Sequence, residues 1–241
     1  MQPETDPDVA WVAALAGSSR SSAEKYLGEA GSDAALFRHL AREHREGGRS
    51  GYVEIDAPQE LYALTRLLRP RHVVEVGVSS GVSSAYLLRA LEKNGRGTLH
   101  SVDLPKIDRR PPNRSASQTA SWSLPFGRGP GWAVPNRLRK RWDLRWGDKA
   151  EVLPLLTEEL PEVGLFVYDV PHWDRDSLRE FRGLDPRLPS GAVAIADHGP
   201  SGDLCRALRQ WARLRHAVPV RRTGLGLYGF RCGSRAARPK R

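Results

Sequence analysis

The chain has 241 residues and a formal net charge of +10 at pH 7, because 38 lysines and arginines outnumber 28 aspartates and glutamates. This length suffices for one α/β domain with a substantial core, and no apolar run reaches the ~18 residues needed to span a bilayer. The acidic N-terminus does not resemble a secretory signal, and Cys205 and Cys232 lack metal-ligand spacing. We therefore expect a cytoplasmic protein. The positive charge makes nucleic acid one possible partner. We disfavour it, because arginines spread along a chain more often form a solvated surface.

Three polar helices are predicted before residue 50. Residues 6–17 begin at a capping aspartate and end at a glycine. Residues 21–31 have the serine and glutamate spacing of a capping box and also end at a glycine, and residues 32–48 repeat this pattern. We expect residues 1–50 to form a helical cap on a main domain at 51–232, and such a cap could support a homodimer.

Helix and strand signals alternate along the main domain. This alternation predicts a doubly wound, Rossmann-like α/β fold with a mostly parallel seven-stranded sheet and an antiparallel last strand. Residues 233–241 are basic and aperiodic, which predicts a disordered tail. The expected helices are residues 57–70, 83–95, 149–160, 174–188 and 202–214, and the expected strands are 72–76, 97–102, 143–146, 163–168, 191–196 and a closing hairpin, 218–224 and 226–232, around Gly224.

Residues 105–142 interrupt the alternation with prolines, glycines, serines, arginines and tryptophans. A segment of this length inside a compact domain is usually either functional or disordered. Trp122, Phe126 and Trp132 favour a lid over a substrate, and a disordered insertion remains the alternative.

Every strand that is expected to be parallel carries a carboxylate at or near its end. Each of these residues has a simpler explanation as a helix cap or turn residue. Ligands of open parallel sheets bind outside the carboxyl ends of the strands, so together the carboxylates predict a rim that suits a cation or a hydroxyl-rich ligand. In strand order they are Glu75, Asp103, Asp148, Asp169 and Asp197.

The first strand runs into a loop of small residues between Gly77 and Gly81. The loop has no G-K-[ST] and does not match G-x-G-x-x-G, which disfavours both a P-loop and a dinucleotide site. The carboxylates would also repel a pyrophosphate. The cationic nucleoside S-adenosylmethionine fits better, because its ribose diol can donate to Asp103 and its amino-acid portion can meet the backbone of the loop.

Five stretches of the sequence, in this order, resemble the motifs of class I S-adenosylmethionine-dependent methyltransferases. The likeness extends over about residues 51–230 and is nearest to small-molecule O-methyltransferases of the bacterial natural-product and catechol types. It implies transfer of a methyl group to a hydroxyl of a small-molecule acceptor. The acceptor could be an intermediate of natural-product biosynthesis. The stretches are "VVEVGVSSGVSSAYLL" (73–88), "LHSVDL" (99–104), "RWGDKAEVLPLL" (145–156), and the pair "LFVYDVPHWDRDSLREF" (165–181) and "LPSGAVAIADHG" (188–199).

The resemblance also implies which residues would hold the cofactor. Asp103 corresponds to the acidic residue that takes the ribose hydroxyls, and Asp148 to the aspartate that contacts the adenine amine. The full implied set is Glu75, Gly77, Ser79, Ser80, Gly81, Ser84, Asp103, Leu104, Gly147, Asp148 and Asp169.

Catalytic roles are predicted at the ends of the fourth and fifth strands. His172 follows Asp169 in a D-x-x-H pattern and is our candidate general base, because imidazole titrates near neutral pH. His198 is the second candidate. Asp169, Asp197 and His198 could also bind a divalent ion such as Mg²⁺, although a histidine ligand departs from the oxygen ligands that magnesium prefers. His172 and Asp197 could instead act as helix caps.

Other functions stay open at this point. A methyltransferase acting on RNA or protein would account for the basic charge. A non-catalytic cofactor-binding protein and a nicotinamide oxidoreductase are further alternatives, and the glycine spacing disfavours the second.

Overall fold

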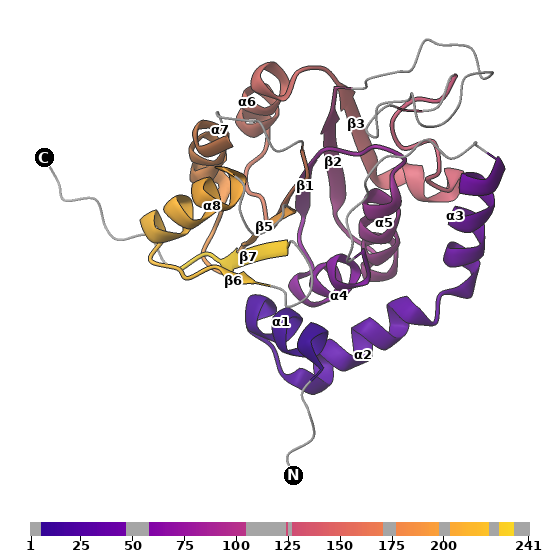
Figure 1. Cartoon of the computed structure of the whole chain (residues 1–241), viewed down its shortest axis with the longest axis horizontal. Coiled ribbons are helices and arrows are strands. Elements are labelled where there is room, and N and C mark those ends of the chain that lie inside the picture. The colour runs from indigo at the N-terminus through magenta and orange to yellow at the C-terminus, as the bar shows by residue number, and fades with distance from the viewer. Residues whose placement is uncertain are drawn as a thin grey trace, which may run out of the picture.

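A computed structural model of the chain describes residues 6–46, 58–104, 124, 127–170, 177–197, 203–221 and 227–233. Its centre is a seven-stranded sheet in the order β3-β2-β1-β4-β5-β7-β6 (Figure 1). All neighbours from β3 to β5 pair in parallel, and β7 pairs antiparallel with both β5 and β6. The predicted fold class is confirmed. The strands are β1 (His72–Val76), β2 (Thr98–Asp103), β3 (Trp142–Trp146), β4 (Leu165–Tyr168), β5 (Val193–Asp197), β6 (Val220–Arg221) and β7 (Leu227–Arg231).

The strand order reverses between β1 and β4. From β1 the chain moves outward to β2 and β3, and it then returns to the other side of β1 to form β4 and β5. In open sheets of this kind the crevice at such a reversal is where ligands bind. The topology therefore directs attention to the residues that leave β1 and β4.

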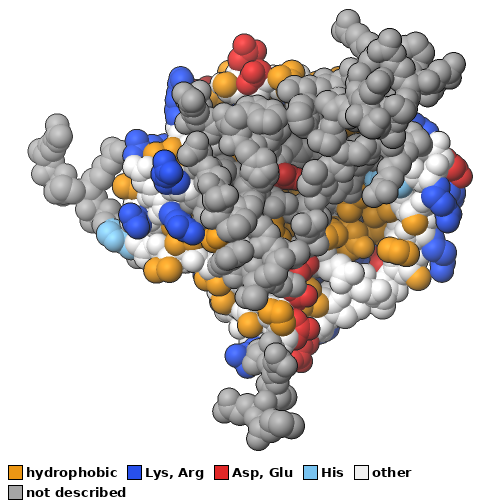
Figure 2. Space-filling view, in the orientation of Figure 1, with side chains coloured by type: hydrophobic (Ala, Val, Ile, Leu, Met, Phe, Trp, Pro, Cys, Tyr) orange, Lys and Arg blue, Asp and Glu red, His pale blue; other side chains and the backbone are white. Residues whose placement is uncertain are grey.

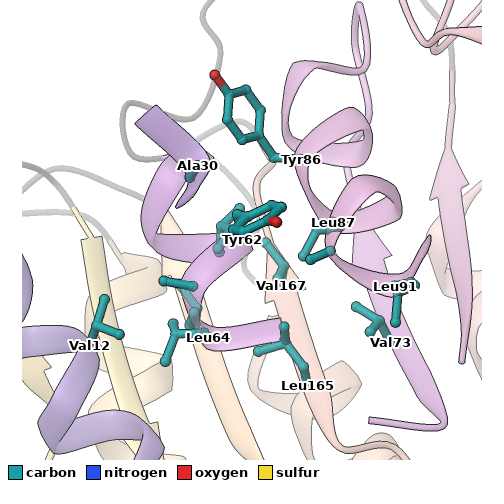
Figure 3. Packing of buried hydrophobic residues seen from close by; sticks show 14 of the residues in the cluster. Val12, Ala30, Tyr62, Leu64, Val73, Tyr86, Leu87, Leu91, Leu165 and Val167 are labelled. Carbon is teal, nitrogen blue, oxygen red and sulfur yellow. The ribbon is translucent and has the colours of Figure 1, made fainter. Parts of the chain in front are cut away.

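Both faces of the sheet are apolar and covered by helices. Successive side chains of a strand point to opposite faces, so Val73 and Leu165 join one core while Val74 and Phe166 join the other. Figure 3 shows the first core, where side chains of α1, α2, α4 and α5 meet those of β1 and β4. The helices of this face are α1 (Pro7–Ala16), α2 (Arg20–Gly31), α4 (Pro58–Leu68) and α5 (Val82–Asn94), and those of the other are α6 (Lys149–Glu159), α7 (Ser177–Leu184) and α8 (Asp203–Leu214).

The N-terminal helices follow the capping signals in the sequence. The Asp6 carboxylate accepts from the Asp8 amide at the start of α1, which ends at Gly17 with φ +61°. Trp11 donates through Nε1 to the β6 carbonyl of Val220 at 2.9 Å, so α1 is tied to the far edge of the sheet.

The third helix, α3 (Ala34–Glu46), lies beside the short 3₁₀ helix η2 (Asn136–Arg141) and α5 (Figure 1). Its buried residues Leu36 and Leu40 join the same core as α1 and α2, and Asp33 just before it binds Arg89 of α5 at 2.7 Å. The three predicted helices therefore pack along one side of the sheet. In the part of the chain that the structure describes, no helix is long and apolar enough to span a bilayer.

A row of polar side chains crosses β1, β2 and β3. His72 Nδ1 lies 3.1 Å from His100 Nε2, and His100 Nδ1 lies 3.0 Å from the Asp143 carboxylate. Burial, and the neighbouring His100, lower the pKa of His72 below its ordinary value. The folded chain therefore favours neutral His72.

This shift predicts a pH-dependent loss of stability. As the pH falls below about 6.5, the unfolded chain binds a proton at His72 more readily than the folded chain, so the free energy of unfolding decreases. We expect the thermal midpoint of a His72→Gln variant, which keeps a donor toward His100, to fall less between pH 7.5 and 5.5 than that of the wild type. Parallel midpoint curves for the two proteins would contradict this role of His72.

Candidate functional site

The loop at the reversal point requires glycine at its first position. Gly77 has φ +90°, and a Cβ atom placed there would lie 1.7 Å from the carbonyl oxygen of Asp169. The Asp169 amide in turn donates to the Val76 carbonyl at 2.8 Å. The ends of β1 and β4 are thus in direct backbone contact, and no side chain fits between them.

Asp103, the last residue of β2, fixes this loop. Its Oδ2 accepts from the amides of Val78 and Ser79, each at 2.8 Å. Burial raises the pKa of Asp103, and the two amide hydrogen bonds oppose that rise. Its other oxygen, Oδ1, has no hydrogen bond within the described part of the chain. One carboxylate oxygen therefore holds the loop while the second can accept from a ligand.

Glu75 lies beneath the loop rather than on its rim, with 0% of its surface exposed. Its two oxygens accept from the hydroxyls of Ser83, Ser84 and Ser101 at 2.6 to 2.7 Å. Burial raises the pKa of Glu75, whereas the three hydrogen bonds favour the ionised form. Trp142 Nε1 donates to Ser101 at 2.9 Å and extends the network to β3. Glu75 and Ser84 thus join β1 and β2 to the first turn of α5.

The outer side of the loop is covered by part of the predicted insertion. Gly131 donates its amide to the Ser79 carbonyl at 2.8 Å, and Ala133 donates to the Ser80 carbonyl at 3.0 Å. Gly81 has φ +94°, and a Cβ there would lie 2.8 Å from the Gly131 Cα. Residues 131–134 are therefore packed against the loop. Most of the predicted lid, including Trp122 and Phe126, lies outside the described residues.

Helix α3 also reaches the loop, which the sequence did not suggest. His44 Nε2 lies 3.2 Å from the Ser80 hydroxyl, and the His44 ring packs on Trp132 with centroids 5.3 Å apart. Ser79 Oγ and Trp132 Nε1 are buried and have no partner among the described residues. These two groups are candidates for hydrogen bonds to a bound ligand. No local spacing marks His44, because its contact depends on how α3 packs.

The end of β3 lies beside the end of β2. Gly147 donates its amide to the Asp103 carbonyl at 2.9 Å. Asp148 is exposed and accepts from the Ala150 amide at 2.8 Å, so it is the N-cap of α6. Leu104 and Trp146 are 56% and 58% exposed, which gives the ends of these two strands an apolar surface.

The predicted catalytic and metal residues are described only in part. His172 and His198 lie outside the described residues, as does the side chain of Asp197, whose backbone ends β5. Asp169 is half-buried beside Gly77. Among the described residues no group of three or more His, Cys, Asp and Glu side chains is placed to hold a metal ion. The metal set remains a prediction.

Comparisons with known proteins bear on the family and the fold of the chain. A family model described as a methyltransferase domain matches residues 74–198, just over half of the chain. No curated protein sequence matches significantly.

Several solved structures share the fold. The O-methyltransferase of Bacillus cereus in complex with SAH is 14% identical, with a TM-score of 0.53 over 83% of this chain and 91% of that one. TomG from Streptomyces achromogenes, an O-methyltransferase of tomaymycin synthesis bound to SAM, is 17% identical, with a TM-score of 0.54 over 84% and 90%. The SAH-bound methyltransferase PaMTH1 of Podospora anserina is 13% identical, with a TM-score of 0.55 over 83% and 88%.

The doubly wound sheet has a glycine loop at its reversal point and Asp103 at the end of the adjacent strand, which is where open α/β sheets bind ligands. The chain belongs to the methyltransferase domain family. The predicted methyltransferase family is therefore confirmed.

The close approach of Gly77 to the backbone of Asp169 predicts that no larger residue fits at this position. Gly77→Ala should lower the free energy of unfolding by at least ~2 kcal/mol, because it adds left-handed strain and a clash with backbone. The matched control is Gly28→Ala in α2, where a Cβ meets nothing within 4 Å and the helix should gain ~0.5–1 kcal/mol. Chemical denaturation measures both. Equal effects of the two substitutions would contradict the contact between β1 and β4.

Proposed function

We propose that this protein transfers a methyl group from S-adenosylmethionine to a hydroxyl of a small molecule. The observation that carries the proposal is Asp103, which holds the glycine loop with Oδ2 and keeps Oδ1 without a partner in the described part of the chain. A carboxylate oxygen in this position suits the hydroxyls of a ribose. The solved structures that share the fold include proteins with SAM or SAH bound, which supports this assignment.

The residues around the loop fit such a cofactor. Gly77 and Gly81 let the backbone approach a ligand without a Cβ in the way. The buried Ser79 hydroxyl has no partner among the described residues, and it would be satisfied by a polar group of the amino-acid portion. The exposed side chains of Leu104 and Trp146 offer an apolar flank for a planar base.

S-adenosylmethionine supplies a methyl group on a cationic sulfur, and its neutral thioether product needs no acid to leave. The chain must therefore hold the acceptor in line, exclude water and remove one proton. Alignment alone contributes ~7–11 kcal/mol in favourable systems. Residues 131–134 help to exclude water, because they cover the loop through Gly131 and Ala133.

We assign removal of the proton from the acceptor hydroxyl to His172, which follows β4 in the sequence. A positioned base contributes about 10²–10⁴-fold to the rate. Asp169, Asp197 and His198 would hold a divalent ion if the acceptor oxygen is stabilised by a metal, and such an ion supplies Lewis-acid stabilisation of an oxyanion. The O-methyltransferases among the similar folds support oxygen as the acceptor atom.

Calorimetry tests the cofactor. Titration should show binding of S-adenosylmethionine and SAH but not of NAD. Asp103→Asn keeps one oxygen for the loop amides and removes a charged acceptor, so it should weaken SAH binding about 10–100-fold. Asp6→Asn, which preserves the cap of α1, is the matched control and should bind as the wild type does. A preference for NAD, or unchanged affinity in Asp103→Asn, would refute the proposed site.

Kinetics with an accepted substrate test the base. His172→Ala should lower kcat about 10²–10⁴-fold while the Kd for SAH stays within about twofold. The control is His216→Asn, an exposed left-handed position that asparagine tolerates. Loss of activity with a chelator and its return with Mg²⁺ would support the metal. If His172→Ala turns over normally, His172 is not the base.

A further inference from the structure

A basic groove lies between α3, the start of η2 and α5. Its volume is about 760 Å³, and five of the residues that line it are arginines: Arg38, Arg42, Arg45, Arg89 and Arg137. Figure 2 shows lysine and arginine side chains along the edge of the molecule where α3 lies in Figure 1. The methyl transfer proposed above uses none of these residues.

Three of the arginines form a stripe along α3. Arg38, Arg42 and Arg45 are spaced i, i+4 and i+7, which places them on one face of the helix. All three are exposed, whereas Leu36 and Leu40 of the same helix are buried in the core. The stripe therefore faces away from the protein interior, and its like charges repel each other in the absence of an anion.

The charges of the groove are only partly compensated by the protein. Arg89 binds Asp33 at 2.7 Å and also contacts Glu92, and Arg137 lies 3.9 Å from Glu92. These pairs neutralise the α5 side. Arg42 lies 3.2 Å from Glu43.

Arg38 and Arg45 differ from the other arginines of the groove. Neither has a hydrogen bond or ion pair within the described part of the chain. Among the described residues, no acidic side chain is paired with the arginine at either end of the stripe.

His39 holds the middle of the stripe in place. Arg42 can only donate, so its 3.1 Å contact makes His39 Nδ1 the acceptor. Nε2 then carries the proton and donates to the Ala133 carbonyl at 3.1 Å. Because the Ala133 amide binds the Ser80 carbonyl, the groove is connected through one residue to the glycine loop.

The lining also includes an exposed aromatic residue. Phe37 is 66% exposed and borders the groove next to Arg38. An exposed aromatic ring beside guanidinium groups can stack on a planar base while the guanidiniums bind phosphate oxygens in pairs.

We infer that this groove binds a nucleoside diphosphate, with its phosphates on Arg38, Arg42 and Arg45 and its base on Phe37. The volume lies within the range of small-ligand sites, roughly 300–1,000 Å³. The stripe spans about 10 Å along the helix, at ~1.5 Å per residue, which suits two linked phosphates better than a long strand. This inference does not depend on the methyl-transfer proposal.

The test is calorimetric titration of the full chain with UDP in the presence of saturating SAH, so that any nucleoside site at the glycine loop is already filled. The wild type should bind UDP, and more weakly as salt rises. The double variant Arg38→Glu/Arg45→Glu should weaken UDP binding at least tenfold, and Phe37→Ala roughly fivefold or more. Arg96→Glu/Arg213→Glu makes the same charge change at two exposed residues outside the groove and should stay within about twofold of the wild type.

Three other outcomes overturn the inference. Absence of UDP binding by the wild type removes the site. Equal weakening by the two double variants shows a general charge effect and no groove. Much tighter binding of a single-stranded oligoribonucleotide, lost in the same double variant, assigns the groove to nucleic acid. If SAH itself fails to bind, the cofactor proposal fails. The UDP titration still decides whether the groove binds a nucleoside diphosphate.

Discussion

The two hydrogen bonds from the amides of Val78 and Ser79 to Asp103 are the interaction on which the rest of the site depends. They join the end of β2 to the turn that leaves β1, at the point where the strand order reverses. Since Gly77 already touches the backbone of Asp169, the same turn is fixed to β4 as well. The crevice is thus defined by three adjacent strands, and only a residue without a side chain can occupy its narrowest point.

This turn is supported from both sides. Beneath it, the buried Glu75 carboxylate accepts hydrogen bonds from three serine hydroxyls. These bonds fix the start of α5 against β1 and β2. Above it, residues 131–133 bind the loop carbonyls, and His44 of α3 binds Ser80. The N-terminal helices are therefore part of the site's architecture and not only a cap. A ligand would meet a preformed backbone, which reduces the ordering that binding must otherwise cost.

Much of this arrangement could be predicted from the sequence, because it depends on local signals. The apolar runs of β1 and β4, the glycine loop and Asp103 at a strand end are each visible in a few consecutive residues. The burial of the Glu75 side chain beneath the loop was not predicted, because it depends on the strand register that pairs Glu75 with Ser101. The contacts of Ala133 and His39 join residues about ninety positions apart, and no periodicity encodes them. The arginine groove at α3 was not predicted, because it depends on how α3 packs beside η2 and α5.

We assign two tasks to the Asp103 carboxylate, and a crystal structure of the chain with SAH bound tests this assignment most directly. We expect the ribose hydroxyls on Asp103 Oδ1, while Oδ2 still accepts from the amides of Val78 and Ser79. A nucleoside bound away from the ends of β1 and β2, or an Asp103 that has left the loop to reach the ligand, would contradict the account.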